Sequence, residues 1–208
     1  MIRETLFCLI ALAFALDARG QEIVWRFDNL SKIGGHSVTV VGTPRVVDTE
    51  RGKAVEFNGA TDGLFFDVNP LAGLKQFTVE VEFQPAADGA EEQRFVHFQE
   101  ATTENRALIE LRILPGGLWC LDTYLRSNQA ERTLIDRAVS HSAAQWHTAT
   151  LTFDGQTMKH YVDGVLEQSG GVAFQPLAAG RTSVGVRQNR VFWFKGRIRE
   201  IRIIPQAR

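Results

Sequence analysis

Apolar and polar residues alternate along most of the chain with a period of two, and this pattern constrains the fold more than any other feature. In QFTVEVEFQP, residues 76–85, phenylalanine and valine occupy alternate positions and polar side chains fill the positions between them. The segments ALIELRI (107–113) and HTATLTF (147–153) repeat the pattern. Because successive side chains of a strand point to opposite faces, each segment predicts a strand half-buried against a core.

Short turn signals separate these segments, while no amphipathic helical window from Ile23 onward exceeds two turns. Residues 70–75 and 142–145 are the only brief helix candidates. Short strands joined by glycine-rich turns predict an all-β fold, a two-sheet antiparallel jelly-roll sandwich in one domain from residue 21 to 208. The turn pairs are Asn58-Gly59, Asp62-Gly63, Asp88-Gly89, Gly116-Gly117, Asp154-Gly155, Asp163-Gly164 and Gly170-Gly171.

The first twenty residues read as a signal peptide. The apolar run from Leu6 to Leu16 fits the roughly 7 to 15 residues of a signal-peptide core and is shorter than the about 20 residues that span a bilayer. Small residues at positions 18 and 20 suit cleavage before Gln21. We therefore expect export, without a membrane span, to the periplasm or cell envelope or as a secreted protein.

Charge and cysteine content narrow the remaining possibilities. The formal net charge is -1, and no block of like charge occurs, so we expect no nucleic-acid partner. Cys8 lies within the predicted signal peptide, which leaves Cys120 without an internal disulfide partner. We expect Cys120 to be a small buried residue rather than a reactive thiol.

The segment WHTATLTFDGQTMKHYVDG, residues 146–164, predicts a strand, an Asp-Gly turn and a returning strand. It also resembles the hairpin of the laminin-G-like jelly roll in the concanavalin A-like lectin and glucanase group, which includes the pentraxins. Further blocks resemble this family in the same order, at residues 25–28, 52–66, 77–85 and 194–205. The resemblance implies the jelly-roll fold, in which the closing strand pairs with the first strand. The hairpin residues that carry it are Trp146, His147, Leu151, Asp154, Gly155, Tyr161, Val162, Asp163 and Gly164.

Sugar binding needs aromatic faces for the rings and polar groups for the hydroxyls. Alternation places Glu110 and Arg112 on one face of their strand. On the next strand it places Asp122 and Tyr124 on the face opposite to that of the apolar residues Trp119 and Leu121. A polar turn at 187–190 leads into three aromatic residues, of which Trp193 is expected at the rim. The alternative is that the aromatics are core and the charges a solvated outer sheet. The candidate carbohydrate-binding residues are Glu110, Arg112, Asp122, Tyr124, Arg187, Asn189 and Trp193.

A calcium site is a second expectation, because many proteins that the chain resembles bind calcium through oxygen ligands in turns. The candidate ligands are Asp28, Asn58, Asp62 and Glu200, the last on the closing strand beside the first. The alternative interpretation is that Asn and Asp stabilise turns and that the glutamate is a surface residue.

Catalysis requires a pair of acids. Glu80 and Glu82 share one strand face, with their Cα atoms about 6.5 to 7 Å apart. A retaining glycosidase needs its two carboxyl groups roughly 5 to 5.5 Å apart, and this Cα spacing does not exclude such a separation. The intervening Val81 replaces the aspartate that hydrolases of this fold carry, so we expect no catalysis from this pair. We expect satisfied core or rim histidines at His147 and His160. The five histidines, which show no metal-binding spacing, are His36, His97, His141, His147 and His160.

These observations favour an exported, non-catalytic, lectin-like module that binds a glycan or polysaccharide. Two alternatives stay open. A glycoside hydrolase or related sugar-processing enzyme of the same fold would release reducing sugar. A protein-adhesion or structural module would bind protein partners and no glycan.

Overall fold

The computed structural model describes residues 20–208, and it is built from strands and turns throughout that range. Residues 1–19, with most of the predicted signal peptide and Cys8, lie outside the described residues. Residues 70–75 form turns and irregular structure, and 142–145 comprise the last residue of a short strand and the turn after it, so neither helix candidate is a helix. Among residues 20–208 we find no helix long and apolar enough to cross a membrane.

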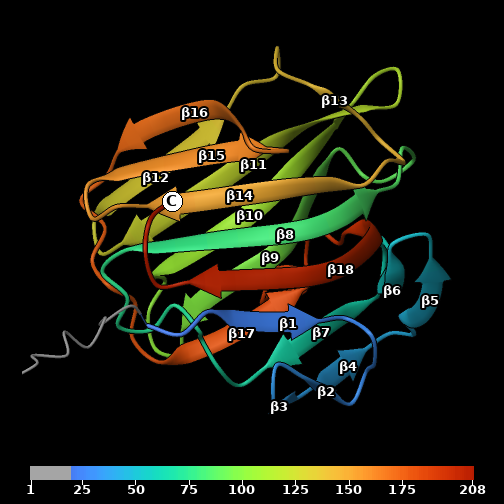
Figure 1. The fold of residues 1–208 in the computed structure, drawn as a ribbon, viewed down its shortest axis with the longest axis horizontal. Coiled ribbons are helices and arrows are strands. Elements are labelled where there is room, and N and C mark those ends of the chain that lie inside the picture. Colours follow the sequence, from blue (N-terminus) through green and yellow to red (C-terminus); the bar gives the residue numbers. More distant parts are fainter. Residues whose placement is uncertain (1–19) are drawn as a thin grey trace, which may run out of the picture.

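Two eight-stranded sheets make up the sandwich, and the first of them, here the front sheet, faces the viewer in Figure 1. All its pairings are antiparallel, and β1 lies beside the closing strand β18, as the sequence predicted. The order is β16 (Val165–Gly171), β15 (Thr157–Val162), β14 (His147–Phe153), β8 (Phe77–Pro85), β18 (Lys195–Ile204), β6 (Gly52–Asn58) and β5 (Arg45–Thr49), with β1 (Ile23–Arg26) paired to β18.

The second sheet, here the back sheet, lies behind the first in Figure 1 and is also antiparallel. Its order is β12 (Ala130–Ile135), β11 (Leu118–Ser127), β10 (Arg106–Leu114), β9 (Glu92–Glu100), β17 (Gly180–Val184), β7 (Gly63–Phe66) and β4 (Thr39–Val41), with β13 (His141–Ser142) paired to β11. The short strands β2 (Lys32–Ile33) and β3 (His36–Ser37) pair with each other. The predicted two-sheet antiparallel sandwich is therefore confirmed.

The hairpin of β14 and β15 forms as the sequence predicted. Asp154 accepts hydrogen bonds through its Oδ1 from the backbone N–H groups of Gln156 and Thr157, at 2.9 and 2.7 Å. Gly155 adopts a φ of +100°, a conformation that L side chains rarely adopt. The Asp-Gly pair is thus turn chemistry that aligns the two strands.

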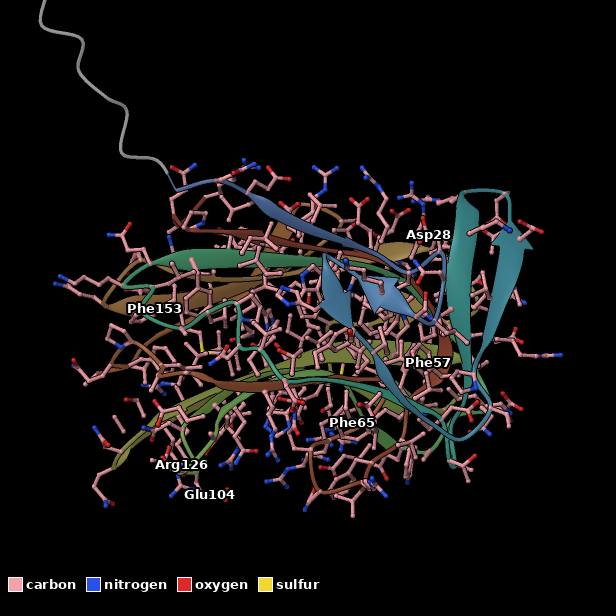
Figure 2. The ribbon with its side chains drawn as sticks, turned by 90° about the horizontal axis from the view of Figure 1, so that it is seen from below. Asp28, Phe57, Phe65, Glu104, Arg126 and Phe153 are labelled. Atoms are coloured by element: carbon pink, nitrogen blue, oxygen red, sulfur yellow. The ribbon has the colours of Figure 1, made fainter. Side chains whose placement is uncertain are left out.

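The core lies between the sheets and is rich in aromatic side chains. The Phe83 ring of the front sheet stacks on the Phe95 ring of the back sheet, with centroids 4.5 Å apart. Figure 2 shows the two layers edge-on, with Glu104 and Arg126 outside the back sheet. Cys120 is fully buried, and burial raises the pKa of its thiol, as expected for an unreactive cysteine.

Candidate functional site

The outer face of the back sheet carries charged side chains that lie in register on adjacent strands. Glu110 on β10 is opposite Asp122 on β11 and Arg94 on β9. Two residues earlier on β10, Leu108 is opposite Tyr124 on β11. Residues two apart on a strand share a face, and the residues between these positions fill the core. Strand alternation therefore gathers these side chains on one outer surface.

The 185–194 loop, which joins β17 to β18, folds against this surface. The backbone N–H of Gln188 donates to Nδ1 of His97 at 3.1 Å. The N–H of Arg94 donates to the carbonyl oxygen of Phe192 at 2.9 Å. These two contacts fix the polar turn of the loop beside the exposed face of β9.

A surface pocket of about 210 Å³ lies between β9, β10, β11, β12 and this loop, and we call it the arginine pocket. Its lining residues are Arg94, Arg106, Leu108, Glu110, Arg112, Asp122, Tyr124, Thr133 and Arg187. Five of the seven residues that the sequence predicted for sugar binding come together here: Glu110, Arg112, Asp122, Tyr124 and Arg187. The sequence pattern missed Arg94 and Arg106, although both follow the same outward alternation.

The other two predicted residues lie outside the arginine pocket. Asn189 lines an adjoining pocket of about 260 Å³, which shares Arg187 with the arginine pocket. Trp193 is half-buried, Phe194 is fully buried, and Phe192 is 36% exposed. Phe192 therefore has the largest exposed fraction of the three aromatic residues, while Trp193 has the partial exposure expected of a rim residue but does not line the arginine pocket.

Contacts between arginine and carboxyl side chains occupy the centre of the arginine pocket. Arg112 Nη2 lies 2.5 Å from Asp122 Oδ2 and 3.6 Å from Glu110 Oε2. Arg112 Nη1 lies 2.7 Å from Glu92 Oε1, and Arg94 Nε lies 3.2 Å from Glu110 Oε1. The side chains of Asp122 and Glu110 are 2% and 4% exposed, so salt screens these pairs much less than it screens surface pairs.

Burial changes the titration of both carboxyl groups. Burial, followed by the charge of Asp122, raises the pKa of Glu110 to about 8, against the opposing effect of Arg94. Burial also raises the pKa of Asp122, while Arg112 opposes that shift. Glu110 therefore carries a proton at neutral pH and is able to donate a hydrogen bond.

Partly exposed aromatic rings flank these charges. The Arg106 guanidinium lies 4.9 Å from the centroid of the half-buried Tyr124 ring, and the Tyr124 hydroxyl donates to Glu131 Oε2 at 2.5 Å. The Arg94 guanidinium lies over the Phe192 ring at 3.7 Å. Flat apolar surface and polar groups thus occur together on this face, the combination that sugar recognition requires.

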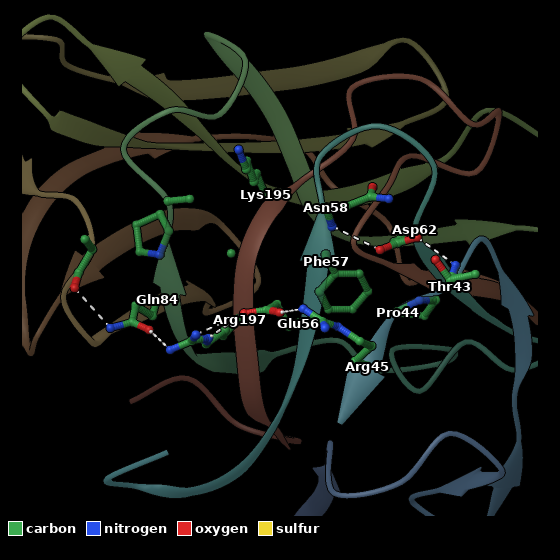
Figure 3. A pocket seen from close by; sticks show the side chains of 14 residues that line it. Thr43, Pro44, Arg45, Glu56, Phe57, Asn58, Asp62, Gln84, Lys195 and Arg197 are labelled. Atoms are coloured by element: carbon green, nitrogen blue, oxygen red, sulfur yellow. Dashed lines mark hydrogen bonds and ion pairs between the residues drawn. The ribbon is translucent and has the colours of Figure 1, made fainter. Parts of the chain in front are cut away.

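A larger cleft of about 1050 Å³ opens elsewhere on the sandwich (Figure 3). Its charged groups are paired with one another or with neighbours. Glu56 lies between Arg45 and Arg197, at 2.7 and 3.0 Å, and Lys195 pairs with Asp88 at 2.5 Å. The cleft is lined by Thr43, Pro44, Arg45, Glu56, Phe57, Asn58, Asp62, Gln84, Pro85, Ala86, Ala144, Lys195, Gly196 and Arg197. The segments that form it are far apart in sequence, so local patterns did not reveal it.

The four calcium candidates do not form one site. Asn58 and Asp62 line the large cleft, whereas Asp28 and Glu200 line a different pocket. Asp62 accepts hydrogen bonds from two backbone N–H groups, those of Thr43 at 2.8 Å and Asn58 at 3.1 Å. Across residues 20–208, no group of three or more His, Cys, Asp and Glu side chains is placed to hold a metal ion. The structure therefore does not bring the four residues together in one pocket, and Asp62 is engaged in turn hydrogen bonds.

Glu80 and Glu82 lie on β8, in the front sheet, on the opposite side of the molecule from the arginine pocket. Glu82 pairs with Arg51 at 3.1 Å and with Arg199. Neither glutamate lines any of the pockets described above. The positions of both residues suit a surface ion-pair network rather than a sugar cleft.

The two hairpin histidines have hydrogen-bond partners, as predicted. His147 bonds through Nδ1 to Asp163 Oδ2 at 2.8 Å and through Nε2 to the carbonyl oxygen of Ser142 at 2.9 Å. His160 bonds through Nδ1 to the Thr123 hydroxyl at 2.9 Å, joining the two sheets. These rings are part of the packing of the sandwich.

Two packed antiparallel sheets with open polar pockets on their surfaces place the chain among the jelly-roll sandwiches. Residues 58–208 match the family described as the concanavalin A-like lectin/glucanases superfamily. The chain belongs to this family, which confirms the resemblance seen in the hairpin. None of the curated proteins matches the chain at the significance we required.

Solved structures share the fold at low sequence identity. Domain 4 of AbnA, a GH43 extracellular arabinanase from Geobacillus stearothermophilus in complex with arabinotriose, is 22% identical, with a TM-score of 0.67. The match covers 91% of this chain and 94% of that domain. A native heptameric SAP-like pentraxin from Limulus polyphemus is 15% identical, with a TM-score of 0.61 and coverage of 74% and 76%.

The binding domain of botulinum neurotoxin DC, in complex with SialylT, is 12% identical with a TM-score of 0.64. That match covers 90% of this chain and 48% of the toxin domain, so this chain corresponds to about half of it. At these identities, the solved structures establish the fold.

Proposed function

We propose that the protein is a non-catalytic, lectin-like module that binds a glycan in the arginine pocket. One observation carries the proposal: suitable side chains from β10, β11 and the 185–194 loop converge on one surface pocket. Guanidinium, carboxyl and phenol groups there can bond sugar hydroxyls. The partly exposed rings of Tyr124 and Phe192 offer apolar faces for sugar rings.

The comparisons support the proposal at the level of the fold. Domain 4 of the arabinanase was solved with arabinotriose and the toxin domain with SialylT. Both are similar to this chain in fold, and we extend glycan binding to this chain as part of the proposal. We do not carry over the identity of either ligand.

Export is part of the same proposal, on the strength of the signal-peptide pattern in residues 1–20. The protein would then act in the periplasm, at the cell envelope or as a secreted protein. Mass spectrometry of the protein recovered from cells tests this step. A mature N-terminus at Gln21 supports export, and an N-terminus at Met1 in all fractions contradicts it.

Native affinity electrophoresis tests glycan binding. The purified protein is run through gels that contain single polysaccharides, each with calcium and with EDTA. Selective retardation by one or a few polysaccharides is the expected result. Retardation that disappears in EDTA would show that calcium takes part. If no polysaccharide slows the protein, the lectin proposal fails and an adhesion or structural role takes its place.

A matched pair of tyrosine variants places the site. Tyr124→Ala removes the aromatic surface of the arginine pocket and is expected to abolish the retardation. Tyr161→Ala removes a similarly half-buried tyrosine from β15 on the front sheet and is expected to leave it unchanged. Equal loss of binding in the two variants would contradict a site at the arginine pocket.

Glycoside hydrolysis is a second candidate, favoured by the two carboxyl groups on adjacent strands. Glu110 holds its proton at neutral pH, which is the state that a general acid requires. Asp122 lies opposite it and contacts the same guanidinium, that of Arg112. Release of reducing sugar that Glu110→Gln abolishes would establish this activity. Binding without any sugar release would establish the non-catalytic function.

A further inference from the structure

Positive charge dominates the arginine pocket. Four guanidinium groups line it against two carboxyl groups, those of Glu110 and Asp122. Arg112 contacts both of these carboxyl groups, Arg94 contacts Glu110, and Glu92 on β9 pairs with Arg94 and Arg112. Arg94 and Arg112 thus have buried or half-buried partners, whereas the excess positive charge lies at Arg106, whose only carboxylate partner among residues 20–208 is the exposed Glu104, and at Arg187.

Arg187 is the clearest case of this excess. Among residues 20–208, no carboxylate lies within ion-pair distance of its guanidinium. Burial, and then the positive charges of Arg106 and Arg94, lower the pKa of Arg187. Holding like charges together in this way costs stability in the unliganded protein. The 185–194 loop nevertheless places Arg187 beside the other two arginines.

Arg106 supplies a second independent observation. Its side chain is 10% exposed, and its Nε–H has no hydrogen-bond partner within residues 20–208. Its Nη1 contacts the carbonyl oxygen of Glu104 at 2.7 Å and the exposed carboxylate of the same residue at 3.2 Å. A buried guanidinium N–H without an acceptor is unfavourable, and Arg106 is also one of the residues that line the arginine pocket, where a ligand could contact its guanidinium group.

We propose that Arg187 and Arg106 bind an oxyanion substituent of an acidic glycan, either the carboxylate of a uronic acid or a sulfate ester. The planar fork of a guanidinium matches the paired oxygens of both groups. The polar and aromatic side chains of the pocket would contact the sugar ring that carries the substituent. This inference rests on the proposed glycan-binding function and names its ligand class.

Charge-matched polysaccharides test the inference by the same gel method. Polygalacturonate is compared with its fully methyl-esterified form, and dextran sulfate is compared with dextran. Each pair keeps the backbone and removes the negative charge. We expect retardation by at least one charged member and none by its neutral counterpart. Which charged member binds distinguishes a carboxylate from a sulfate.

Arginine variants then separate specific binding from general charge attraction. Arg187→Gln is expected to weaken binding of the charged polymer by at least about tenfold, the loss typical of a charge-assisted hydrogen bond. Arg51→Gln removes the same charge from the front sheet, beside Glu82, and is expected to change binding less than twofold. Equal losses in the two variants would overturn the inference.

Thermal unfolding provides a readout that a purely structural role would not produce. Because Arg187 lies among like charges, Arg187→Gln is expected to leave the Tm of the unliganded protein equal or higher. A large fall in Tm would instead assign a structural role to Arg187. If only neutral polysaccharides bind, the glycan function stands and the acidic-ligand inference is wrong. If no polysaccharide binds, both are wrong.

Discussion

Glu110 on β10 and Asp122 on β11 lie directly opposite each other on the outer face of the back sheet, and one guanidinium, that of Arg112, contacts both. Because the side chains of Glu110 and Asp122 are nearly inaccessible to solvent, their contacts with Arg112 affect the stability of the fold as well as ligand binding.

Glu110→Gln is expected to flatten the dependence of stability on pH. The folded chain keeps the Glu110 proton up to a pKa of about 8, whereas the unfolded chain loses it near 4.5. Stability present below 4.5 is therefore lost as the pH rises toward 8, with a slope of up to about 1.4 kcal/mol per pH unit. Urea unfolding at several pH values measures the slope. The exposed control Glu50→Gln should keep the wild-type slope, and an unchanged slope in Glu110→Gln would contradict the prediction.

Asp122→Ala is expected to lower the free energy of unfolding by about 3 kcal/mol. The substitution removes the carboxylate that lies 2.5 Å from the Arg112 guanidinium, whose side chain is only 14% exposed. The matched change Asp48→Ala breaks the exposed pair with Lys53, in which the side chains are 86% and 54% exposed. That control should cost at most about 1 kcal/mol. Denaturant unfolding of both variants gives the comparison, and equal costs would refute the buried-pair interpretation.

Gly185→Ala is expected to destabilise the protein more than Gly116→Ala. Both glycines have a positive φ, +82° and +79°, which by itself costs an alanine about 1 to 2 kcal/mol. At Gly185, an added Cβ would also lie 2.3 Å from Phe57 Cδ1, whereas nothing lies within 4 Å at Gly116. The clash should add about 1 to 3 kcal/mol. Thermal and urea unfolding measure the difference. Equal losses of stability in the two variants would show that the structure around Gly185 accommodates the added Cβ at no further cost.

His160→Gln is expected to make the protein less sensitive to acid. Burial lowers the pKa of His160 from 6.5 to about 4. Between these values the unfolded chain binds a proton that the folded chain does not, so stability falls as the pH drops through this window. The wild type should lose up to about 3 kcal/mol by this route. Unfolding measured at pH 7 and at pH 4 should show a smaller difference in the variant, and an equal difference would exclude His160 as the cause.

The sequence predicted the strands well because strand formation here follows local alternation. The segment 147–153 is β14 with the same bounds, and the outward positions Glu110 and Tyr124 lie where alternation placed them. Alternation also assigns Arg94 and Arg106 to the outer face, but it does not say which strands are neighbours. The clustering of these arginines depends on pairings between distant segments, and so it became visible only in the structure.

The burial of charged side chains on the outer face of the back sheet could not be predicted from the sequence either. A charged strand face is usually solvated, which would leave Glu110 ionised. The side chain of Glu110 is instead 4% exposed, beneath arginine side chains and beside the 185–194 loop. The large cleft and the separation of the calcium candidates have the same origin. They depend on how loops and distant strands are arranged in space, which a period-two pattern does not encode.

An amide-resolved NMR titration of the protein with trigalacturonate, an acidic trisaccharide, shows where on the sandwich the glycan binds. We expect chemical-shift changes confined to β9, β10, β11 and the 185–194 loop, including Leu108, Tyr124 and Arg187. Saturable changes centred instead on Arg45, Glu56 and Arg197 of the large cleft would contradict a site at the arginine pocket. The absence of any change at millimolar trigalacturonate would contradict recognition of a uronate carboxylate.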